Sequence, residues 1–468
     1  MLPYLDYLQV PYMRDYLLTR LHDGIITGKM LHNEHLRIIF HFGIVGYSIF
    51  LRQIFLLIRI MIKKTLFQLF LLTFLFSCAS ENSSHIKIEP ESLGISTEKL
   101  NKLIGKVNEL VDNGKIPCVQ TALLKNGKLV SFHTYGYSDV ESKKELEDNS
   151  IFRIYSMTKP IVSIGLMMLY EKGIFELNDN VSKYIPQFND LVVYDSSEHI
   201  KAKDPIKIID LLRHSSGIGY GWSDNQYLNS MYSELWKSKN NEEFVDRVSE
   251  IPLFTSPNTE WRYGVNTDIC GYLIEVLSGQ SLDEYLSEYI FKPLNMTDTH
   301  FILAEKKINR FTLNYVFNES SKKLSRLDKY DSGSYSNITF FSGGGGLVST
   351  TKDYIKFTLT LLKNKKYSDV RLLKDETLDL MTKNHIPHLD YPWGKGIGFG
   401  LGFSVVTEQK ESELKDNNGT FGWSGMAGTL FSVDPKEELI LIFMTQRNHP
   451  WGDIHKIFNN FAYESLIR

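Results

Sequence analysis

The order of apolar and polar residues predicts a helix and then a hairpin near the start of the region that can fold. Apolar side chains recur at helical spacing over 96–115, where a Ser-Thr pair opens the segment and Gly114 closes it, so we expect an amphipathic helix. The following segment, 118–139, contains two strand-like runs that meet at Asn126-Gly127. Because Asn-Gly is the strongest short hairpin signal, these runs predict the first two strands of an antiparallel sheet.

A second helix is expected to start at Ser156 and to end at Gly173, and its residues are apolar nearly all round. Such a pattern is typical of a helix that is buried on every side. The region 174–335 is predicted to be mostly helix and loop. Prolines punctuate it at Pro186, Pro205, Pro252, Pro257 and Pro293.

The last part of the chain returns to strands. A glycine run at 343–346 leads into a helix that Thr350 or Thr351 is expected to cap. Strands are expected in 398–408, 419–434 and 438–446, and a final helix in 454–467. The sequence therefore predicts an α+β architecture: an antiparallel sheet formed from both chain ends and flanked by helices, a mostly helical inserted region, and a cleft between the layers.

The segment 61–78 has the pattern of an export signal: Met61, two lysines, an apolar run, and then Ser77-Cys78. It resembles the signal of a bacterial lipoprotein, which implies cleavage before Cys78, acylation of that cysteine, and a lipid-anchored protein of the cell envelope. The apolar run is shorter than the ~20 residues that a membrane-spanning helix needs. A simple signal peptide cut elsewhere, or an uncleaved anchor that recruits 38–60, remains an alternative.

These features divide the chain into expected parts. We expect translation to begin at Met61, so that 1–60 is an upstream extension or an artefact. The remaining parts are a signal peptide at 61–77, a polar tether at 78–94 and a folded domain at 95–468.

Composition excludes several classes of protein. The chain of 468 residues is 43% hydrophobic and 13% aromatic, which suits a large buried core. Its formal net charge is −3 and its basic residues are dispersed, so we expect no nucleic-acid partner. The three cysteines, Cys78, Cys118 and Cys270, are too few for a disulfide framework and lack the paired spacing of a zinc site. An oligomeric state is not predicted.

Ser156 and Lys159 are the strongest candidates for chemistry. The pattern Ser-x-x-Lys is weak by itself, because it also begins at Ser84, Ser96, Ser320, Ser349 and Ser412. Only Ser156 opens a helix that is apolar nearly all round, which would present its first turn from the core into a cleft. Three residues along a helix brings Lys159 to the same face as Ser156, within reach of its hydroxyl. An ordinary lysine has a pKa of about 10.4, so a role as base requires burial or a second cation.

Several motifs, in order and spacing, resemble the serine beta-lactamase-related family, which includes class C beta-lactamases, DD-peptidases and penicillin-binding-protein-like carboxylesterases. They lie at 156–160, 176–188, 208–221, 261–301, 340–357 and 419–435. The resemblance covers nearly all of 95–468 and implies a beta-lactamase/transpeptidase-like fold, no metal and no organic cofactor. It implies that Ser156 is the acylated nucleophile, that Lys159 is its proton acceptor, and that Tyr263 helps to move the proton.

The third motif, Trp423-Ser424-Gly425, distinguishes the branches of that family. Lactamases carry Lys-Thr-Gly there, and the lysine meets the substrate carboxylate, whereas Trp-x-Gly is similar to the esterase-like branch. The resemblance implies that these residues bind substrate and that the backbone N–H groups of Ser156 and Met426 form the oxyanion hole. A tryptophan offers an apolar wall without charge, which favours small neutral esters or amides as substrates.

The spacing after Tyr263 agrees with that branch. Tyr263 and Asp268 keep the esterase-like register, so Asn266 is not assigned as the lactamase asparagine. His214 could be a general base, although the family resemblance of its loop favours a structural role. A surface loop is the expected setting of His385 and His388.

Glycines recur in two further places. Those between Gly394 and Gly402 lead into a strand rather than a helix, so we expect close backbone packing instead of a nucleotide loop. The run 343–346 is expected to form a tight turn near the cleft.

The sequence therefore predicts a serine hydrolase of the carboxylesterase type that works through an acyl-serine intermediate. A beta-lactamase or DD-peptidase acting on cell-wall-type substrates is the alternative within enzymes. A non-catalytic, penicillin-recognising or envelope-binding protein is the alternative from another class.

Overall fold

The computed structural model describes residues 89–195, 199–327, 335–363, 365–448 and 453–467. Residues from Ile88 to Arg468 form one compact unit. The predicted extension at 1–60, the signal peptide at 61–77 and Cys78 lie outside the described residues, as does the tether up to residue 88.

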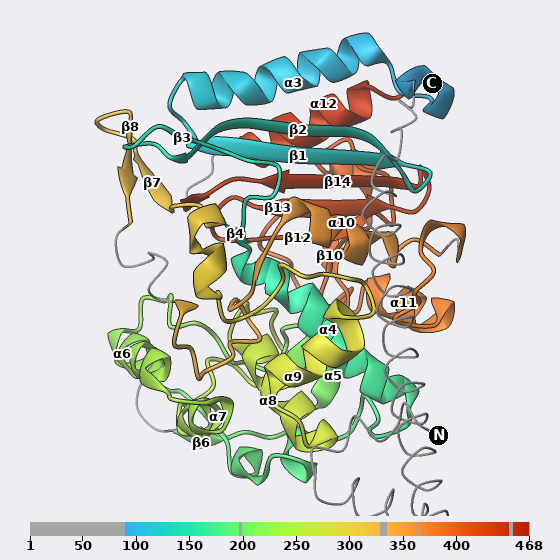
Figure 1. The fold of residues 1–468 in the computed structure, drawn as a ribbon. Coiled ribbons are helices and arrows are strands. Elements are labelled where there is room, and N and C mark those ends of the chain that lie inside the picture. Colours follow the sequence, from blue (N-terminus) through green and yellow to red (C-terminus); the bar gives the residue numbers. More distant parts are fainter. Residues whose placement is uncertain (1–88, 196–198, 328–334, 364, 449–452, 468) are drawn as a thin grey trace, which may run out of the picture. The chain divides into compact units, whose positions relative to one another are not determined.

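An antiparallel sheet of eight strands forms the upper half of this unit in Figure 1, in the order β10-β11-β12-β13-β14-β1-β2-β3. The first strands are β1 (Cys118–Lys125), β2 (Lys128–Asp139) and β3 (Lys144–Glu145), and the later ones are β10 (Ile397–Phe399), β11 (Ser404–Val406), β12 (Phe421–Ser424), β13 (Leu430–Asp434) and β14 (Leu439–Met444). In the middle, β1 pairs with β14, so that Leu123 lies opposite Leu441. The predicted sheet from both chain ends is confirmed.

The predicted hairpin joins β1 to β2. Asn126 has a φ of 53° and Gly127 a φ of 70°, and two consecutive positive φ values are what a two-residue hairpin turn requires. Lys125 pairs with Lys128 across this turn. The Asn-Gly signal therefore gave the correct connection.

Helices cover both faces of the sheet (Figure 1). The amphipathic helix α3 (Thr97–Asp112) begins after Ser96, whose side chain accepts a hydrogen bond from the Lys99 N–H. It packs with the final helix, α12 (Ile454–Glu464), over one face. On the other face lie α10 (Thr351–Leu359) and the buried helix α4 (Thr158–Glu171).

The inserted region is mostly helical, as predicted, and α4 packs against its longest helix, α8. Its helices are α5 (Ile208–Leu212), α6 (Gln226–Glu234), α7 (Asn241–Ser249), α8 (Asn266–Ser278) and α9 (Leu282–Leu286), and α11 (Asp375–Thr382) follows α10. Short strands complete the fold: β4 (Phe152–Arg153) with β9 (Val348–Ser349), β5 (Val192–Val193) with β6 (Ile200–Lys201), and β7 (Tyr315–Asn318) with β8 (Lys323–Arg326) and β15 (Arg447–Asn448).

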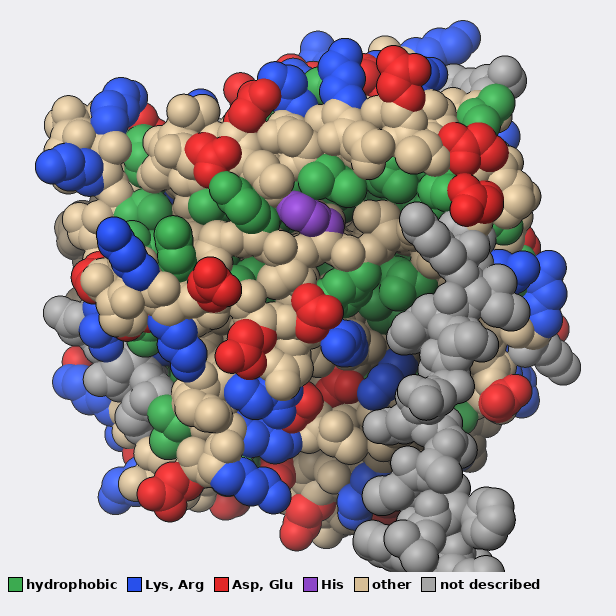
Figure 2. Space-filling model, turned by 45° about the horizontal axis from the view of Figure 1, so that its top comes forward, with side chains coloured by type: hydrophobic (Ala, Val, Ile, Leu, Met, Phe, Trp, Pro, Cys, Tyr) green, Lys and Arg blue, Asp and Glu red, His purple; other side chains and the backbone are tan. Residues whose placement is uncertain are grey.

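Two surface properties bear on function. On the face shown in Figure 2, lysine and arginine side chains are interspersed with aspartate and glutamate side chains, so this face offers no extended area of one charge. Among the described residues, every helix is too short or too polar to cross a membrane.

Candidate active site

Ser156 lies where the short strand β4 turns into the helix α4. A 3-10 turn at Tyr155–Met157 precedes α4, which begins at Thr158, so the α-helix starts two residues later than the sequence predicted. The reason is Tyr155, whose φ of 41° lies in the left-handed region that bulky residues avoid. The Asn314 side chain holds this conformation by donating a hydrogen bond of 3.0 Å to the Tyr155 hydroxyl. Ser156 is partly exposed in the middle of this turn.

Lys159 is buried beneath Ser156, with 1% of its surface exposed. Its Nζ atom lies 3.3 Å from Ser156 Oγ, 2.8 Å from the Tyr220 hydroxyl and 2.7 Å from the Gly344 carbonyl oxygen. A lysine ammonium group has three N–H bonds, so each of them finds an acceptor here. The structure therefore brings Ser156 and Lys159 together in the way the sequence predicted.

The glycine run forms the predicted tight turn beside the lysine. The Gly346 N–H donates to the Ser342 carbonyl oxygen at 2.9 Å. The Asp268 side chain holds the turn in place. Asp268 Oδ1 accepts hydrogen bonds from Ser342 Oγ at 2.6 Å and from the Gly344 N–H at 3.0 Å. The carboxylate thus holds Gly344, whose carbonyl oxygen holds Lys159.

Asp268 is itself buried, with 2% of its surface exposed. Burial raises the pKa of its carboxyl group, while the positive charge of Lys159 and the two hydrogen bonds act in the opposite direction. Asp268 Oδ2 has no hydrogen-bond partner among the described residues. A Cβ atom on Gly344 would lie 2.2 Å from this oxygen, so only glycine fits against the carboxylate.

Tyr263 also lies at the site, but the lysine contacts its ring rather than its hydroxyl. Lys159 Nζ is 4.7 Å from the centroid of the Tyr263 ring, in the geometry of a cation–π contact. The hydroxyl that Lys159 meets belongs to Tyr220, whose ring centroid is 5.3 Å from that of Tyr263. The sequence interpretation missed Tyr220 as a candidate, although it lies in the motif at 208–221.

Tyr220 has surroundings that disfavour its charged form. Burial raises the pKa of the Tyr220 hydroxyl well above its ordinary value, and Tyr263 and Asp268 raise it further. Neutral Tyr220 can accept the hydrogen bond from Lys159 and still offer its own O–H as a donor. The sequence did carry one signal for Tyr220, because glycines stand on both sides of it. Gly221 adopts a φ of 72°, which glycine accepts most readily, and this fixes the end of the loop.

His214 takes part in a buried network and not in contact with the serine. Its Nδ1 atom lies 3.0 Å from Asn266 Nδ2, and Asn266 Oδ1 accepts a hydrogen bond from Ser216. Burial lowers the pKa of the His214 imidazole well below its usual range, and the charge of Lys159 adds to this effect. A neutral histidine that accepts from an amide supports the structural role that the sequence favoured. Asn266 belongs to the same network.

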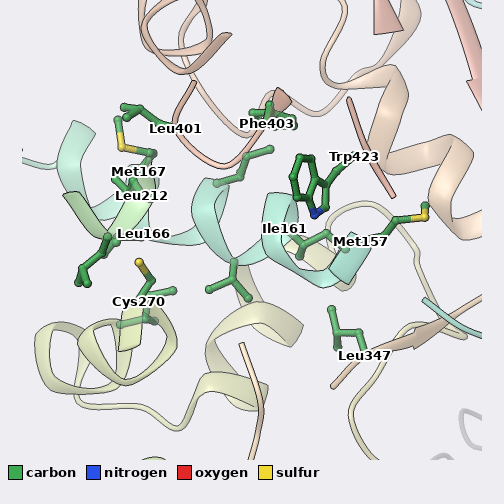
Figure 3. Packing of buried hydrophobic residues seen from close by; sticks show 14 of the residues in the cluster. Met157, Ile161, Leu166, Met167, Leu212, Cys270, Leu347, Leu401, Phe403 and Trp423 are labelled. Atoms are coloured by element: carbon green, nitrogen blue, oxygen red, sulfur yellow. The ribbon is translucent and has the colours of Figure 1, made fainter. Parts of the chain in front are cut away.

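The third motif closes the other side of the site. Trp423 and Ser424 end strand β12, and the turn that follows carries Met426. A Cβ atom on Gly425 would lie 2.3 Å from the Ile154 carbonyl oxygen, so this turn lies directly against the segment that leads to Ser156. Figure 3 shows Trp423 above the first turn of α4.

The remaining candidates have structural partners. His385 Nε2 lies 2.7 Å from the Leu380 carbonyl oxygen, and His388 Nε2 lies 2.9 Å from Asn258 Oδ1. In the part of the chain that the structure describes, no group of histidine, cysteine and acidic side chains could hold a metal ion.

The glycines between 394 and 402 allow close packing, as predicted. A Cβ atom on Gly400 would lie 2.1 Å from the Met381 carbonyl oxygen, and one on Gly402 would lie 2.3 Å from Ser163 Oγ. These positions bring the sheet edge close to α11 and α4.

Known proteins from several bacteria are similar in sequence over most of this chain. "Protein Rv1367c" of Mycobacterium tuberculosis is 28% identical over 355 residues, which cover 73% of this chain and 88% of that protein. A protein of Escherichia coli K12 that bears the name "Putative D-alanyl-D-alanine carboxypeptidase" is 26% identical over 432 residues, which cover 86% of this chain and 95% of that protein.

Solved structures share the fold. EstCE1, described as "a hydrolase with promiscuous acyltransferase activity", superposes with a TM-score of 0.69 at 22% identity, covering 78% of this chain and 99% of EstCE1. Simvastatin synthase from Aspergillus terreus superposes with a TM-score of 0.68 at 24% identity, covering 78% of this chain and 98% of that enzyme. The sequence model of the family described as "Beta-lactamase" matches residues 103–461. With this match over most of its length, and with a beta-lactamase/transpeptidase-like fold, the chain belongs to the beta-lactamase family.

Proposed function

We propose that the protein is a serine hydrolase that cleaves neutral esters through an acyl-serine intermediate. The observation that carries this proposal is the distance of 3.3 Å between Lys159 Nζ and Ser156 Oγ at the start of a buried helix. A serine hydroxyl becomes a useful nucleophile when a neighbouring group accepts its proton, and Lys159 is the group within reach.

In the first step, Ser156 Oγ forms a bond to the ester carbonyl carbon while its proton passes to Lys159 Nζ, which has first given up one of its own protons. The ammonium group that results has acceptors in Ser156 Oγ, the Tyr220 hydroxyl and the Gly344 carbonyl oxygen, and these stabilise it. The negative charge that develops on the carbonyl oxygen would be held by the N–H groups of Ser156 and Met426.

The bond between the carbonyl carbon and the alcohol oxygen then breaks, and the departing alkoxide takes the proton from Lys159. Tyr263, whose ring lies against Lys159, is proposed to relay this proton. In the second half of the reaction, water attacks the acyl-serine, gives up a proton by the same route, and releases the acid with the Ser156 hydroxyl restored.

The preference for neutral esters rests on Trp423. This side chain stands where lactamases have a lysine that meets the substrate carboxylate, and it is buried, with 6% of its surface exposed. An indole offers apolar area and no charge to compensate a carboxylate. A peptide that ends in D-alanine would therefore lack its usual partner at this position.

A fluorophosphonate probe tests the nucleophile. We expect mass mapping to find the label on Ser156, and the labelling to disappear in Ser156→Ala. Ser320→Ala is the matched control, because Ser320 starts another Ser-x-x-Lys pattern in an exposed loop and should leave labelling unchanged. A folded protein that takes up no label would support a binding protein instead.

Substrate comparison then separates the enzymes. We expect hydrolysis of p-nitrophenyl butyrate and poor turnover of nitrocefin and of peptides ending in D-Ala-D-Ala. Efficient turnover of nitrocefin or of such a peptide would favour the beta-lactamase or the DD-peptidase hypothesis.

We also propose that the mature protein is anchored to the cell envelope by lipid on Cys78. The sequence pattern of 61–78 supports this. Intact mass of the membrane fraction should show a diacyl or triacyl group on a chain that begins at Cys78, and Cys78→Ala should release the protein from membranes. A mature chain that retains residues before Met61 would contradict the proposed start.

A further inference from the structure

Three indole side chains around the site are exposed to solvent. The exposed fraction is 73% for Trp222, 51% for Trp236 and 52% for Trp393. Large apolar side chains of this kind are costly to leave in water, and a group of them marks a binding surface more often than single ones do. Their sequence positions are far apart, so the fold brings them together.

Ring contacts join the three indoles into one surface, which we call the aromatic arc: Trp222, Trp236, Tyr220, Tyr263, Trp393 and Trp423. At one end, the rings of Trp222 and Trp236 are nearly parallel to that of Tyr220, at 18° and 16°, with centroid distances of 4.6 and 6.4 Å. In the middle, Tyr220 meets Tyr263 at 5.3 Å.

At the other end, the centroid of the Trp393 ring lies 4.9 Å from that of Tyr263 and 5.6 Å from that of Trp423. The planes of the Trp393 and Trp423 rings differ by 27°. The arc therefore continues from Trp222 and Trp236 on one side of Tyr263 to Trp393 on the other, and it ends at the buried Trp423. Its centre borders the reacting atoms, because the Tyr220 hydroxyl and the Tyr263 ring both contact Lys159.

The exposed indoles are held in place from behind. Trp236 packs on Phe244 at 5.7 Å and on Phe340 at 6.5 Å, and Trp393 packs on Trp261 at 5.0 Å. A ring that is fixed on one side and open on the other loses little conformational freedom when a ligand stacks on it.

The loop that carries Trp222 is fixed as well. Asn229 Nδ2 donates to the Ser223 carbonyl oxygen at 2.6 Å, and Ser223 Oγ donates to Asn229 Oδ1 at 2.9 Å. A Cβ atom on Gly221 would lie 2.6 Å from Tyr232 Cβ, so the chain is pressed against α6 directly before Trp222.

Trp423 adds a polar feature to this apolar surface. Its Nε1 atom is buried and has no hydrogen-bond partner among the described residues, and Figure 3 shows this nitrogen at the edge of the ring nearest the first turn of α4. A buried N–H group without an acceptor is unfavourable, so this nitrogen is an unpaired donor at the inner end of the aromatic arc.

We propose that the aromatic arc binds the non-reacting part of the substrate, and that this part is a neutral, planar ring system. The inference rests on the proposed esterase function and names its substrate class: aryl esters, with the ring on the acyl or the alcohol side. Flat rings stack on indole and phenol faces with a geometry that aliphatic chains do not match.

The test compares ring-bearing and small esters of equal charge. Hydrolysis of 2-naphthyl acetate, methyl 2-naphthoate and ethyl acetate is followed by acid release for the native protein and for Trp222→Ala, Trp236→Ala and Trp393→Ala. The control is Tyr227→Ala, because Tyr227 is also half exposed and lies on α6, but its ring meets Tyr194 and His199 instead of the arc.

We expect the tryptophan variants to lose about tenfold in kcat/KM for a naphthyl ester and less than about twofold for ethyl acetate. Tyr227→Ala should change neither. The naphthyl ester that shows the loss tells whether the ring lies on the acyl or the alcohol side. Equal losses for both ester types, or no loss in any tryptophan variant, would overturn the inference while leaving the esterase function intact.

A binding measurement keeps the test independent of turnover. In the Ser156→Ala background, 2-acetylnaphthalene should quench tryptophan fluorescence in a saturable way, and each indole deletion should weaken this binding about tenfold. If the fluorophosphonate probe does not label the native protein, the proposed function is wrong. The fluorescence titration would still show whether the aromatic arc binds a planar ring. Absence of saturable binding would reject the ring site itself.

Discussion

Replacing Gly344 by alanine should strongly lower the activity of a protein that still folds, whereas Gly345→Ala should be tolerated. A Cβ atom on Gly344 would lie 2.2 Å from Asp268 Oδ2 and 2.9 Å from its Cγ. Asp268 cannot turn away, because its other oxygen is held by Ser342 Oγ and the Gly344 N–H. A Cβ atom on Gly345 would meet the Tyr155 carbonyl carbon at 3.7 Å, which is an ordinary contact.

The size of the effect follows from these distances. Ordinary contact begins near 3.4 Å, so Gly344 must move by about 1 Å to accept the methyl group. The hydrogen bond from Lys159 to the Gly344 carbonyl oxygen, now 2.7 Å, would then exceed the length at which such bonds contribute. Losing a hydrogen bond to a charged group costs about 1.5–3 kcal/mol, which corresponds to a decrease of about 10- to 100-fold in kcat/KM.

The assay measures kcat/KM with p-nitrophenyl butyrate for both variants, and circular dichroism reports whether each is folded. The reasoning would be refuted if Gly344→Ala kept kcat/KM within about twofold of the native value. It would also fail if Gly345→Ala lost as much activity as Gly344→Ala, because the two substitutions differ only in what the new methyl group meets.

Three further predictions follow from the site and the core. Tyr220→Phe removes the hydroxyl that accepts one of the hydrogen bonds from Lys159 but keeps the ring, so kcat/KM with p-nitrophenyl butyrate should fall about 10-fold or more. Unchanged kinetics would exclude the Tyr220 hydroxyl from the reaction. Asp268→Asn keeps an oxygen that can accept hydrogen bonds from Ser342 and Gly344, whereas Asp268→Ala leaves both donors unpaired. Denaturant unfolding should therefore show that the alanine variant is less stable than the asparagine variant by about 1–3 kcal/mol. Equal stabilities of the two variants would contradict this. Burial raises the pKa of Asp416 to about 6, which means that the folded state binds its proton more tightly than the unfolded state and that stability falls as the pH rises from about 4 through 6. Asp416→Asn should avoid this loss, so the variant should gain about 2 kcal/mol relative to the native protein between pH 4 and pH 7. Parallel stability curves of the two proteins would contradict the raised pKa of Asp416.

The sequence predicted the parts of the fold that depend on local pattern. The apolar stripe of α3 and the Asn-Gly turn between β1 and β2 both appear where the pattern placed them. Ser156 and Lys159 could be paired in advance because the spacing of a helix alone brings them to one face.

Other parts of the site depend on tertiary structure. Tyr220 lies in a loop without periodicity, and its contact with Lys159 joins residues 61 positions apart. Asp268 could be placed in a family register, but its hydrogen bond to the glycine turn joins residues 76 positions apart, and no local pattern indicates it. The left-handed Tyr155, which delays the start of α4, has no signal in the sequence because tyrosine ordinarily avoids that conformation.

The pairing of β1 with β14 also determines when the protein can fold. Thr445, next to the end of β14, donates a hydrogen bond to the Cys118 carbonyl oxygen across 327 residues of sequence. The centre of the sheet therefore cannot form before nearly all of the chain has been synthesised, and such long-range closure makes folding slow. A chain that stays unfolded until its last strands are made could still pass through an export channel during synthesis, which is what the proposed export to the cell envelope would require.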